Sequence, residues 1–298
     1  MVLFGDLFGG RWLFESGVSG YFLLRVVVRV VCDGGWVVLP PFTGKVVKSL
    51  LIRGFGGLDS VFGGVFNPKP IHVSPLLVGG RWLWKRGGER GVLRVRCGSE
   101  AVFYVGCTED VAGMVFSGVE GLSGAELFNA RWELVSLDIE RYDLPSEDLG
   151  IGIDGHDRVV VEFKSPAILV DPYKASPSNP RFLPLAGVLF SYNIGDLLRM
   201  RRREHRWESR FWAAVDIVNA VLHEHRRILD NIYTVTYNYD GRIGYGVGGR
   251  AVYYIVKRII REKPWVKAFL ENIIVHARIM GVGSSRANGF GHVSIRLE

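Results

Sequence analysis

Four glycines near the end of the chain enclose a short polar and basic segment, with the spacing G-x-G-x5-G-x-G. They are Gly281, Gly283, Gly289 and Gly291, and between them stand Ser284, Ser285, Arg286, Ala287 and Asn288. Because glycine accepts positive φ and close approach of other atoms, consecutive backbone N–H groups of such a loop can point at a phosphate. Arg286 would add positive charge at the centre, so we predict a phosphate-binding loop over 281–291.

This loop differs from the two common nucleotide-binding loops. No Gly-Lys-Ser/Thr follows it, which excludes a Walker loop, and it precedes an expected strand, whereas a dinucleotide-binding loop follows one. The alternative is a plain structural turn between a helix and a strand. The spacing of the four glycines is much more specific than that of a bare glycine turn, and His292, directly after the loop, could contact RNA if the loop binds it.

A series of arginines is the second candidate for phosphate contacts. Its members are Arg199, Arg202, Arg203, Arg206 and Arg210. Spacings of 3, 1, 3 and 4 place them on one stripe of an α-helix, and the forked donors of arginine suit phosphate. The stripe is either a phosphate-binding row or a solvated helix face, and the sequence leaves both readings open.

Charge is distributed unevenly along a chain whose net charge is +7. Residues 1–100 carry 13 basic and 6 acidic side chains, residues 101–180 carry 5 and 14, and residues 181–298 carry 19 and 10. Concentrated positive charge attracts a polyanion by neutralising its phosphates and releasing counterions. The alternative is solubilising surface charge, but the clustering favours nucleic acid as the partner.

Several function classes receive no support from the sequence. The three cysteines, Cys32, Cys97 and Cys107, have no metal-type spacing, so we expect buried reduced thiols. His223 and His225 are two residues apart and would lie on different faces of a helix, so we expect neither a metal site nor a cofactor. The longest apolar run, Phe22–Val31, is interrupted by arginines and is too short for a membrane span of ~20 residues.

The chain begins without a basic region followed by an apolar block, so we expect no signal peptide, no membrane and a cytoplasmic location. It contains no glutamine, which is a weak sign of a thermophilic source because thermophile proteins avoid thermolabile amides.

The first half of the chain has a β-α-β-β-α-β pattern. The β-branched run 22–31 predicts a strand, and 43–53 has the apolar spacing of a helix. Extended segments are expected over 71–77 and 92–105, a helix capped by Thr108 through 116, and a closing strand over 132–139.

The second half repeats this order after an acidic, glycine-containing segment, 143–158. We expect a strand at 159–163, a long helix over about 188–229, strands at 233–239 and 251–256, and a last strand at 290–297. Asp240-Gly241, after the strand at 233–239, is a hairpin signal. Pro264 should begin a helix that Gly281 ends, and its apolar residues have the spacing of a buried face: Val266, Phe269, Leu270, Ile273, Ile274 and Ala277. The prediction is an α+β protein with two tandem ferredoxin-like, RRM-like domains, 1–142 and 143–298.

The glycine loop, its place between the last helix and the last strand, and the tandem domain order resemble the CRISPR repeat-processing endoribonucleases of the repeat-associated mysterious protein (RAMP) superfamily. The resemblance is sharpest over 230–298 and thinner over 39–77, where Pro-Phe-Thr-Gly-Lys and Lys-Pro-Ile-His-Val-Ser-Pro-Leu look similar to the family. It implies metal-independent cleavage, in which the ribose 2′-OH attacks the adjacent phosphate and leaves a cyclic phosphate and a 5′-OH.

The resemblance also implies where catalytic groups should lie, and here the sequence departs from the family. Many members have a His in the loop after the first helix and a Tyr on that helix, but 54–67 contains no His and 43–53 no Tyr. Lys69 is the best match to the family's Lys, and Lys45 and Lys48 lie on the first helix. His72 is either a fourth catalytic candidate or a structural residue.

The resemblance names CRISPR repeat RNA as the partner, bound by a monomer or a homodimer. Two rival functions remain. One is a non-catalytic subunit that holds guide RNA within a CRISPR effector complex, which would fit the missing His. The other is an RNA-binding or RNA-processing protein outside CRISPR biology.

Overall fold

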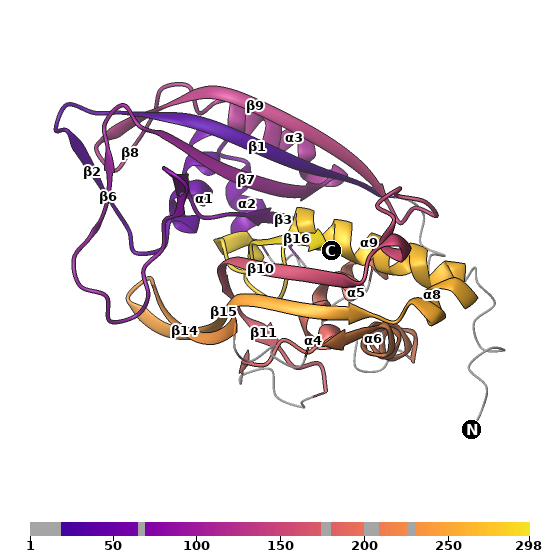
Figure 1. The fold of residues 1–298 in the computed structure, drawn as a ribbon. Helices are drawn as coiled ribbons and strands as arrows, with labels where there is room; N and C mark the ends of the chain where they lie inside the picture. The colour runs from indigo at the N-terminus through magenta and orange to yellow at the C-terminus, as the bar shows by residue number, and fades with distance from the viewer. Residues whose placement is uncertain (1–18, 65–68, 174–179, 200–208, 226–230) are drawn as a thin grey trace.

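The computed structural model describes residues 19–64, 69–173, 180–199, 209–225 and 231–298. Two antiparallel sheets lie one above the other, and each carries its helices on one face (Figure 1). The chain builds the upper unit first and then the lower one, as the colour change from indigo to yellow shows.

The first sheet is centred on β1 (Ser19–Val31), which pairs with β7 (Glu100–Thr108) and β9 (Ala130–Leu144). Val26, Val28 and Val30 are fully buried, whereas Arg25 and Arg29 on the other face are exposed, the alternation expected of a strand covered on one side. The remaining strands are β3 (Ile71–Val73), β4 (Leu77–Val78), β5 (Arg81–Trp82) and β8 (Ala125–Leu127).

Three helices cover the buried face of this sheet: α1 (Gly44–Gly54), α2 (Leu58–Gly63) and α3 (Glu109–Glu120). Close packing of α1 on α3 depends on glycine, since a Cβ on Gly54 would lie 1.9 Å from the carbonyl oxygen of Gly118. A small separate sheet pairs β2 (Trp36–Leu39) with β6 (Leu93–Arg96).

The second sheet is centred on β10 (Arg158–Ala167), which lies between β15 (Arg242–Ile255) and β16 (Val293–Leu297). The strands β14 (Ile232–Tyr239) and β13 (Leu222–Glu224) both pair with β15. Asp240 and Gly241 join β14 to β15 with positive φ at both positions, which confirms the expected hairpin.

The helices of the second unit lie behind its sheet in Figure 1. They are α4 (Ala186–Leu189), α5 (Ser191–Leu197), α6 (Ser209–Val221), α8 (Lys257–Glu262) and α9 (Pro264–Met280). The predicted apolar face of α9 is confirmed: Val266, Phe269, Leu270, Ile273, Ile274 and Ala277 are all buried. The two-stranded sheet of β11 (Leu169–Val170) and β12 (Pro180–Arg181) completes this unit.

The four strands of the first β-α-β-β-α-β unit lie in the order β3-β7-β1-β9, and those of the second in the order β14-β15-β10-β16. In both sheets the spatial order is therefore second, third, first and fourth strand of the unit. This is the ferredoxin-like order, so the predicted fold class is confirmed. Residues 145–157 connect the two units, and Asn272 of α9 fixes this connection by hydrogen bonds to the amide and carbonyl of Ser146. The division between 142 and 143 stays a prediction.

Several predicted elements differ from the structure. The strand expected over 251–256 begins nine residues earlier, at Arg242, directly after the hairpin turn. The expected strand over 92–105 is two strands separated by a turn in which Gly98 has φ of 82°. The last strand begins at Val293, three residues later than expected, because Gly289 and Gly291 have positive φ. The long helix over 188–229 is wrong: α5 ends before Arg199, where φ is 52°, and the chain after α6 becomes strand β13.

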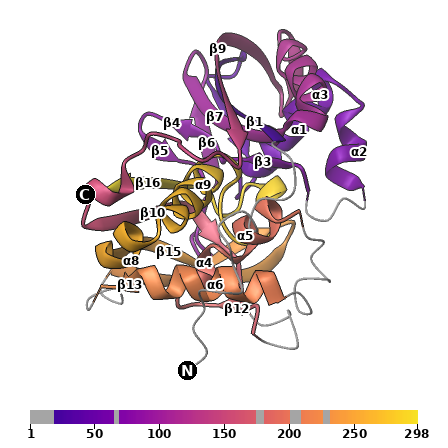
Figure 2. The ribbon, with the colours of Figure 1, turned by 90° about the vertical axis from the view of Figure 1, so that its right-hand side faces the viewer.

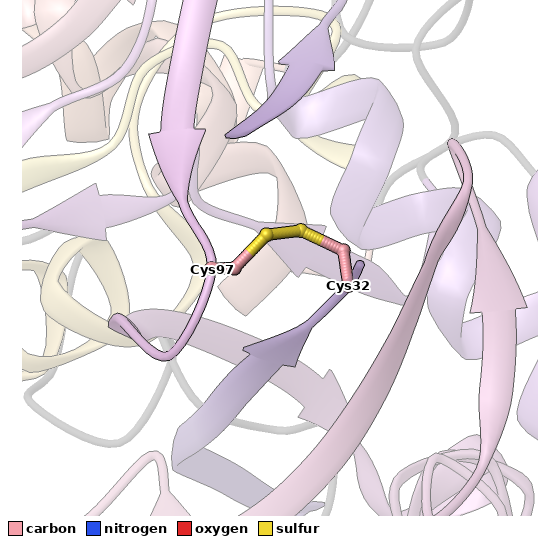
Figure 3. Close-up of a disulfide and its surroundings, with 2 residues drawn as sticks. All are labelled: Cys32 and Cys97. Carbon is pink, nitrogen blue, oxygen red and sulfur yellow. A yellow bond between two sulfur atoms is a disulfide. The ribbon is translucent and has the colours of Figure 1, made fainter. Parts of the chain in front are cut away.

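Two of the three cysteines also differ from the expectation. Cys32 and Cys97 form a disulfide at the β2–β6 end of the first unit, with their Cα atoms 5.4 Å apart (Figure 3). Cys107 is a buried free thiol, as expected, and burial raises its pKa to about 12. None of the described helices combines the length with the apolar character of a membrane span.

Candidate functional site

Helix α1 carries two of the predicted catalytic lysines on its solvent-facing margin. Its apolar residues Val46, Val47, Leu50 and Leu51 are fully buried. Lys45 and Lys48 are three residues apart, so they extend from the same side of the helix one turn from each other. The buried face therefore holds the helix and fixes the direction of both lysines.

Phe62 brings Lys48 and Lys69 together. The Lys48 ammonium lies 5.3 Å from the centre of the Phe62 ring, and the Lys69 ammonium donates a hydrogen bond to the Phe62 carbonyl. Partial burial lowers the pKa of Lys48; the positive charge of Lys45 lowers it further, while Asp59 and Asp240 oppose the shift. Three predicted residues, Lys45, Lys48 and Lys69, are thus neighbours in the structure.

The same lysines meet the second domain. Lys45 forms an ion pair with Asp240 at the tip of the β14–β15 hairpin. Beneath this pair, Phe42 stacks on Phe290 with ring centres 4.3 Å apart, and Tyr239 packs against both rings. The margin of α1 and the hairpin tip therefore form one surface that spans the two domains.

The glycine loop lies against the start of α1 and against β3 (Figure 2). A Cβ on Gly289 would lie 2.7 Å from the Cα of Gly44, and one on Gly283 would lie 2.6 Å from the carbonyl oxygen of Ile168. Only glycine allows this contact, and both residues also have positive φ. The loop is therefore a joint between the domains.

Several of the loop's backbone N–H groups already have partners within the protein. The N–H groups of Gly281, Ser284, Asn288, Gly289 and Gly291 all donate to backbone carbonyl oxygens. The predicted cradle of consecutive N–H groups aimed at a phosphate is therefore wrong for these five groups. The side chains of Ser284, Ser285 and Asn288 are partly exposed and remain predicted RNA contacts.

Arg286 points into the protein. It is 3% exposed and forms an ion pair with Asp196 of α5. A direct phosphate contact by Arg286, which the sequence predicted, does not fit this burial. The pair instead holds the loop on α5, because a buried charge is retained only with a partner.

A buried cluster of polar side chains supports that ion pair. Asn193 donates hydrogen bonds to His276 Nδ1 and to the Gly281 carbonyl, at 3.0 and 2.8 Å. His276 Nε2 lies 3.8 Å from Asp196, and burial lowers the pKa of His276 to about 4. The glycine loop is thus fixed by α5 and α9 from below and by α1 and β3 from above.

His72 and His292 form a buried pair above the same loop. The Arg286 carbonyl accepts from Nδ1 of His72 at 3.2 Å, so Nε2 of His72 accepts from Nδ1 of His292, also at 3.2 Å. Burial lowers the pKa of His72 well below its ordinary value and that of His292 to about 3. At exposures of 0% and 6%, neither ring reaches RNA in this conformation, so the structural alternative for His72 fits better.

The predicted arginine stripe is not one helix face. Arg199 follows α5 with positive φ and donates to the Ser19 hydroxyl, whereas Arg210 belongs to α6. Arg202, Arg203 and Arg206 lie outside the described residues. Without a continuous helix, the regular spacing loses the physical meaning given to it above.

Two acidic residues of the site could not be found from sequence. Asp240 and Asp196 are separated from their partners, Lys45 and Arg286, by 195 and 90 residues. The residues around Asp196 form no recognisable motif, and the Asp240-Gly241 pair indicates only a turn. Among the described residues, no three His, Cys, Asp or Glu side chains are placed to hold a metal ion.

A pocket of about 620 Å³ lies elsewhere, at the disulfide end of the first domain. Cys32, Arg53, Glu126, Asn129 and Arg131 contribute to its lining. None of the predicted site residues lines it, so the candidate site is the surface formed by α1, Lys69 and the hairpin tip.

Comparison with known protein families finds a likeness for the first half of the chain. Residues 24–142 match the family model described as the Cas6 N-terminal domain. This segment is therefore similar to a Cas6 N-terminal domain. The search of curated proteins finds no match.

Solved structures extend the likeness to almost the whole chain. Thermus thermophilus Cas6 superposes with a TM-score of 0.53 at 11% identity, covering 94% of this chain and 100% of that one. A Cas6 product complex gives 0.56 at 15% identity, covering 93% and 99%. A structure described as a RAMP protein binding different RNA substrates gives 0.53 at 13% identity, covering 92% and 99%.

These structures share the fold of this chain. Together with the match of residues 24–142 to the Cas6 N-terminal domain model, they confirm the resemblance to CRISPR repeat-processing RAMP-type proteins. The lysine margin of α1 belongs to the matched domain, and the β14–β15 hairpin and the glycine loop belong to the part covered by fold alone.

Proposed function

We propose that this chain binds CRISPR repeat RNA and cleaves it without a metal ion, by attack of a ribose 2′-OH on the adjacent phosphate. The observation that carries the proposal is the contact of both Lys48 and Lys69 with Phe62, with Lys45 one helical turn from Lys48 on α1. These three lysines lie on the segment that matches the Cas6 N-terminal domain model, and Lys45 pairs with the neighbouring hairpin through Asp240.

The proposed reaction needs only proton transfer and charge stabilisation. A bond forms from the 2′-oxygen to phosphorus, the bond from phosphorus to the 5′-oxygen breaks, and the proton lost by the 2′-OH is replaced by one gained on the 5′-oxygen. The phosphorane between these states carries extra negative charge, which ammonium groups held nearby stabilise. A lysine of lowered pKa, such as Lys48, is also suited to proton transfer.

Lys48 and Lys69 would act on the scissile phosphate, and Lys45 would orient the hairpin through Asp240. The buried histidines would support the loop and the domain contact, not the chemistry. This division of roles would explain how cleavage proceeds without a histidine in 54–67, because lysines would take the role that a histidine has in many family members.

The similar structures include a Cas6 solved as a substrate-mimic complex and a RAMP protein binding different RNA substrates, which supports RNA of this kind as the ligand. Repeat RNA is therefore the proposed partner, with a monomer or a homodimer as the binding form. A partial Cas6-RT-Cas1–Cas2 complex contains a chain of which 47% is covered by this fold, so assembly with other CRISPR proteins is a second proposed partnership.

The test is to incubate the protein with end-labelled repeat RNA and to map both ends of every product. We expect one cut per repeat, with a 2′,3′-cyclic phosphate on one fragment and a 5′-OH on the other. Tight binding with intact RNA would instead support the non-catalytic guide-RNA subunit, which the absence of a histidine in 54–67 keeps as the rival function. Products with a 5′-phosphate would contradict the proposed mechanism.

A further inference from the structure

In the described part of the chain, no helix lies on one face of the second sheet. Helices α6 and α9 lie on its other face, and β10 and β15 run across the front of Figure 1 without a covering element. Strand pairing places Arg158 opposite Tyr254, and Glu162 opposite both Arg250 and Ser294. Since directly paired residues point to the same side, these residues share the open face.

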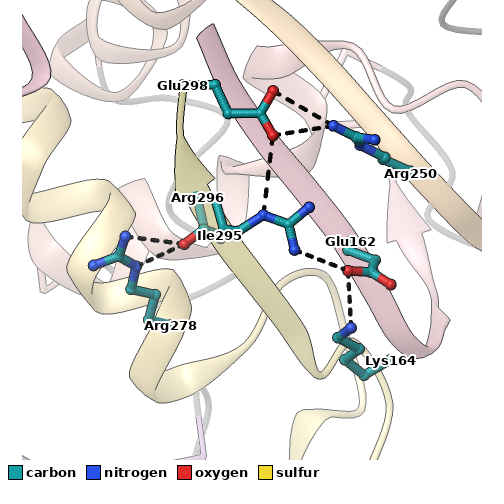
Figure 4. A network of polar contacts seen from close by, with 7 residues as sticks. All are labelled: Glu162, Lys164, Arg250, Arg278, Ile295, Arg296 and Glu298. Carbon is teal, nitrogen blue, oxygen red and sulfur yellow. Dashed lines mark hydrogen bonds and ion pairs between the residues drawn. The ribbon is translucent and has the colours of Figure 1, made fainter. Parts of the chain in front are cut away.

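Charged side chains form a network over this face (Figure 4). Glu162 accepts from Lys164 at 2.9 Å and from Arg296 at 3.5 Å, and Glu298 accepts from Arg250 at 3.1 Å. Lys164 and Arg296 lower the pKa of Glu162, so this carboxylate stays ionised. Together with Arg158, these described side chains place four cations against two carboxylates.

These ion pairs are open to exchange. The side chains of Arg250 and Arg296 are 44% and 54% exposed, and exposed pairs contribute only about 0–1 kcal/mol. A phosphate that approaches the network can therefore replace a carboxylate as the partner of either guanidinium at little cost. Arginine is suited to this exchange because its donors fit phosphate bidentately.

An aromatic side chain stands at one end of the network. Tyr254 is 38% exposed, with the Arg158 guanidinium 5.4 Å from its ring centre and the His225 ring 5.0 Å away. Exposed aromatic rings next to cations are the elements on which single-stranded nucleic acids stack their bases. A duplex cannot use such a ring in this way, because its bases stay stacked on one another.

The open face of the first sheet provides a comparison within the same molecule. On this face β1 and β9 carry three cations, Arg25, Arg29 and Arg131. Strands β7 and β9 carry four carboxylates, Glu100, Glu133, Asp138 and Glu140. Net charge is therefore negative there and positive on the second sheet. A polyanion is repelled by the first face and attracted by the second.

We propose that the open face of the second sheet, made of Arg158, Lys164, Arg250, Tyr254 and Arg296, binds single-stranded RNA that extends from the segment held at the α1 lysines. The proposal rests on the proposed function for the source of that RNA. Trp84 of the first domain donates to the Lys164 carbonyl at 3.0 Å, so this face continues directly from the domain boundary.

The test compares repeat RNA alone with repeat RNA carrying ten added uridines, by fluorescence anisotropy over a range of salt concentrations. We expect the extension to tighten binding to the wild-type chain. Arg250→Ala with Arg296→Ala should remove that gain and lower the salt slope by about one unit for each phosphate that is no longer neutralised. Tyr254→Leu should weaken binding of the extension about tenfold, the value of one stacked base.

The matched control is Arg25→Ala with Arg29→Ala, which removes two exposed arginines from the first sheet and should leave the gain unchanged. Thermal melting checks that each variant is folded, and Arg250→Lys with Arg296→Lys should keep most of the gain because it keeps the charge. The inference is overturned if the extension adds no affinity, or if the arginine variants keep the full gain. If the wild-type chain binds the extended RNA more tightly but does not cleave repeat RNA, the proposed function is overturned and this inference stands.

Discussion

Lys48 has an environment unlike that of an ordinary surface lysine. Its ammonium packs over Phe62, and both burial and Lys45 lower its pKa. Partial burial destabilises the charged form of such a lysine in the free protein. The same cation stabilises the negative charge that develops on the phosphate in the transition state. Its contribution should therefore appear in the cleavage step and not in RNA affinity.

Replacing either Lys48 or Lys69 by alanine should lower the single-turnover cleavage rate by ~10²–10³ and leave the Kd for RNA nearly unchanged. Saturating enzyme and end-labelled repeat RNA give the rate. Lys267→Ala is the control, because Lys267 pairs with Asp154 in the second domain. Wild-type rates in both variants would refute the placement of the catalytic surface on α1.

The pH dependence follows from the direction of the Lys48 pKa. A lysine with a lowered pKa loses its charge at a pH below the ordinary 10.5, so the cleavage rate should fall on the alkaline side earlier than a normal lysine allows. Lys48→Arg keeps the charge at every accessible pH, so its rate should not show this fall. If the wild-type chain and Lys48→Arg lose activity at the same alkaline pH, loss of the Lys48 charge is not the cause of that fall.

At the scale of elements, the glycine loop sets the position of α1. Because Gly289 touches Gly44 and has φ of 94°, Gly289→Val should displace the start of α1 and lower cleavage by at least tenfold. The control is Gly113→Ala, since a Cβ at Gly113 meets nothing within 4 Å. Circular dichroism and melting separate a displaced helix from an unfolded domain. Unchanged cleavage in a folded Gly289→Val protein would show that the loop does not position α1.

Elements were predictable where a local rule decides them. Pro264 begins α9 and Gly281 ends it, and the Asp240-Gly241 turn forms the hairpin, because backbone preferences of single residues dominate there. The helix expected over 188–229 failed for the opposite reason: nothing local indicates that Arg199 adopts positive φ and reaches Ser19, 180 residues earlier.

The candidate site was predictable in its lysines but not in its geometry. Lys45, Lys48 and Lys69 could be named from the sequence, whereas burial of Arg286 depends on Asp196, and the Lys45 contact depends on Asp240. Both acids approach only through tertiary packing. The glycine spacing correctly indicated that another group lies close to the loop backbone. The sequence analysis expected a phosphate there, whereas in the structure the neighbouring group is the start of α1.

For the whole molecule, the Cys32–Cys97 disulfide closes a loop of 65 residues. A cross-link of this length stabilises a fold by about 4 kcal/mol if it acts through the entropy of the unfolded chain. Cys32→Ser with Cys97→Ser should lower the free energy of unfolding by about that amount in denaturant titrations. Cleavage at 25 °C should persist, because the disulfide lies at the β2–β6 end of the domain, away from the lysines. Equal stability of the two proteins would contradict a structural role for the bond.

The central claim is cleavage by the RNA's own 2′-OH, promoted by lysines and not by a metal ion. The most direct measurement is single-turnover cleavage of end-labelled repeat RNA in excess chelator, with and without a single deoxyribose on the 5′ side of the cut. The account predicts an unchanged rate in chelator, no cleavage of the deoxy-substituted RNA, and equal binding of both RNAs. Loss of activity in chelator that magnesium restores, or cleavage of the deoxy-substituted RNA, would contradict it.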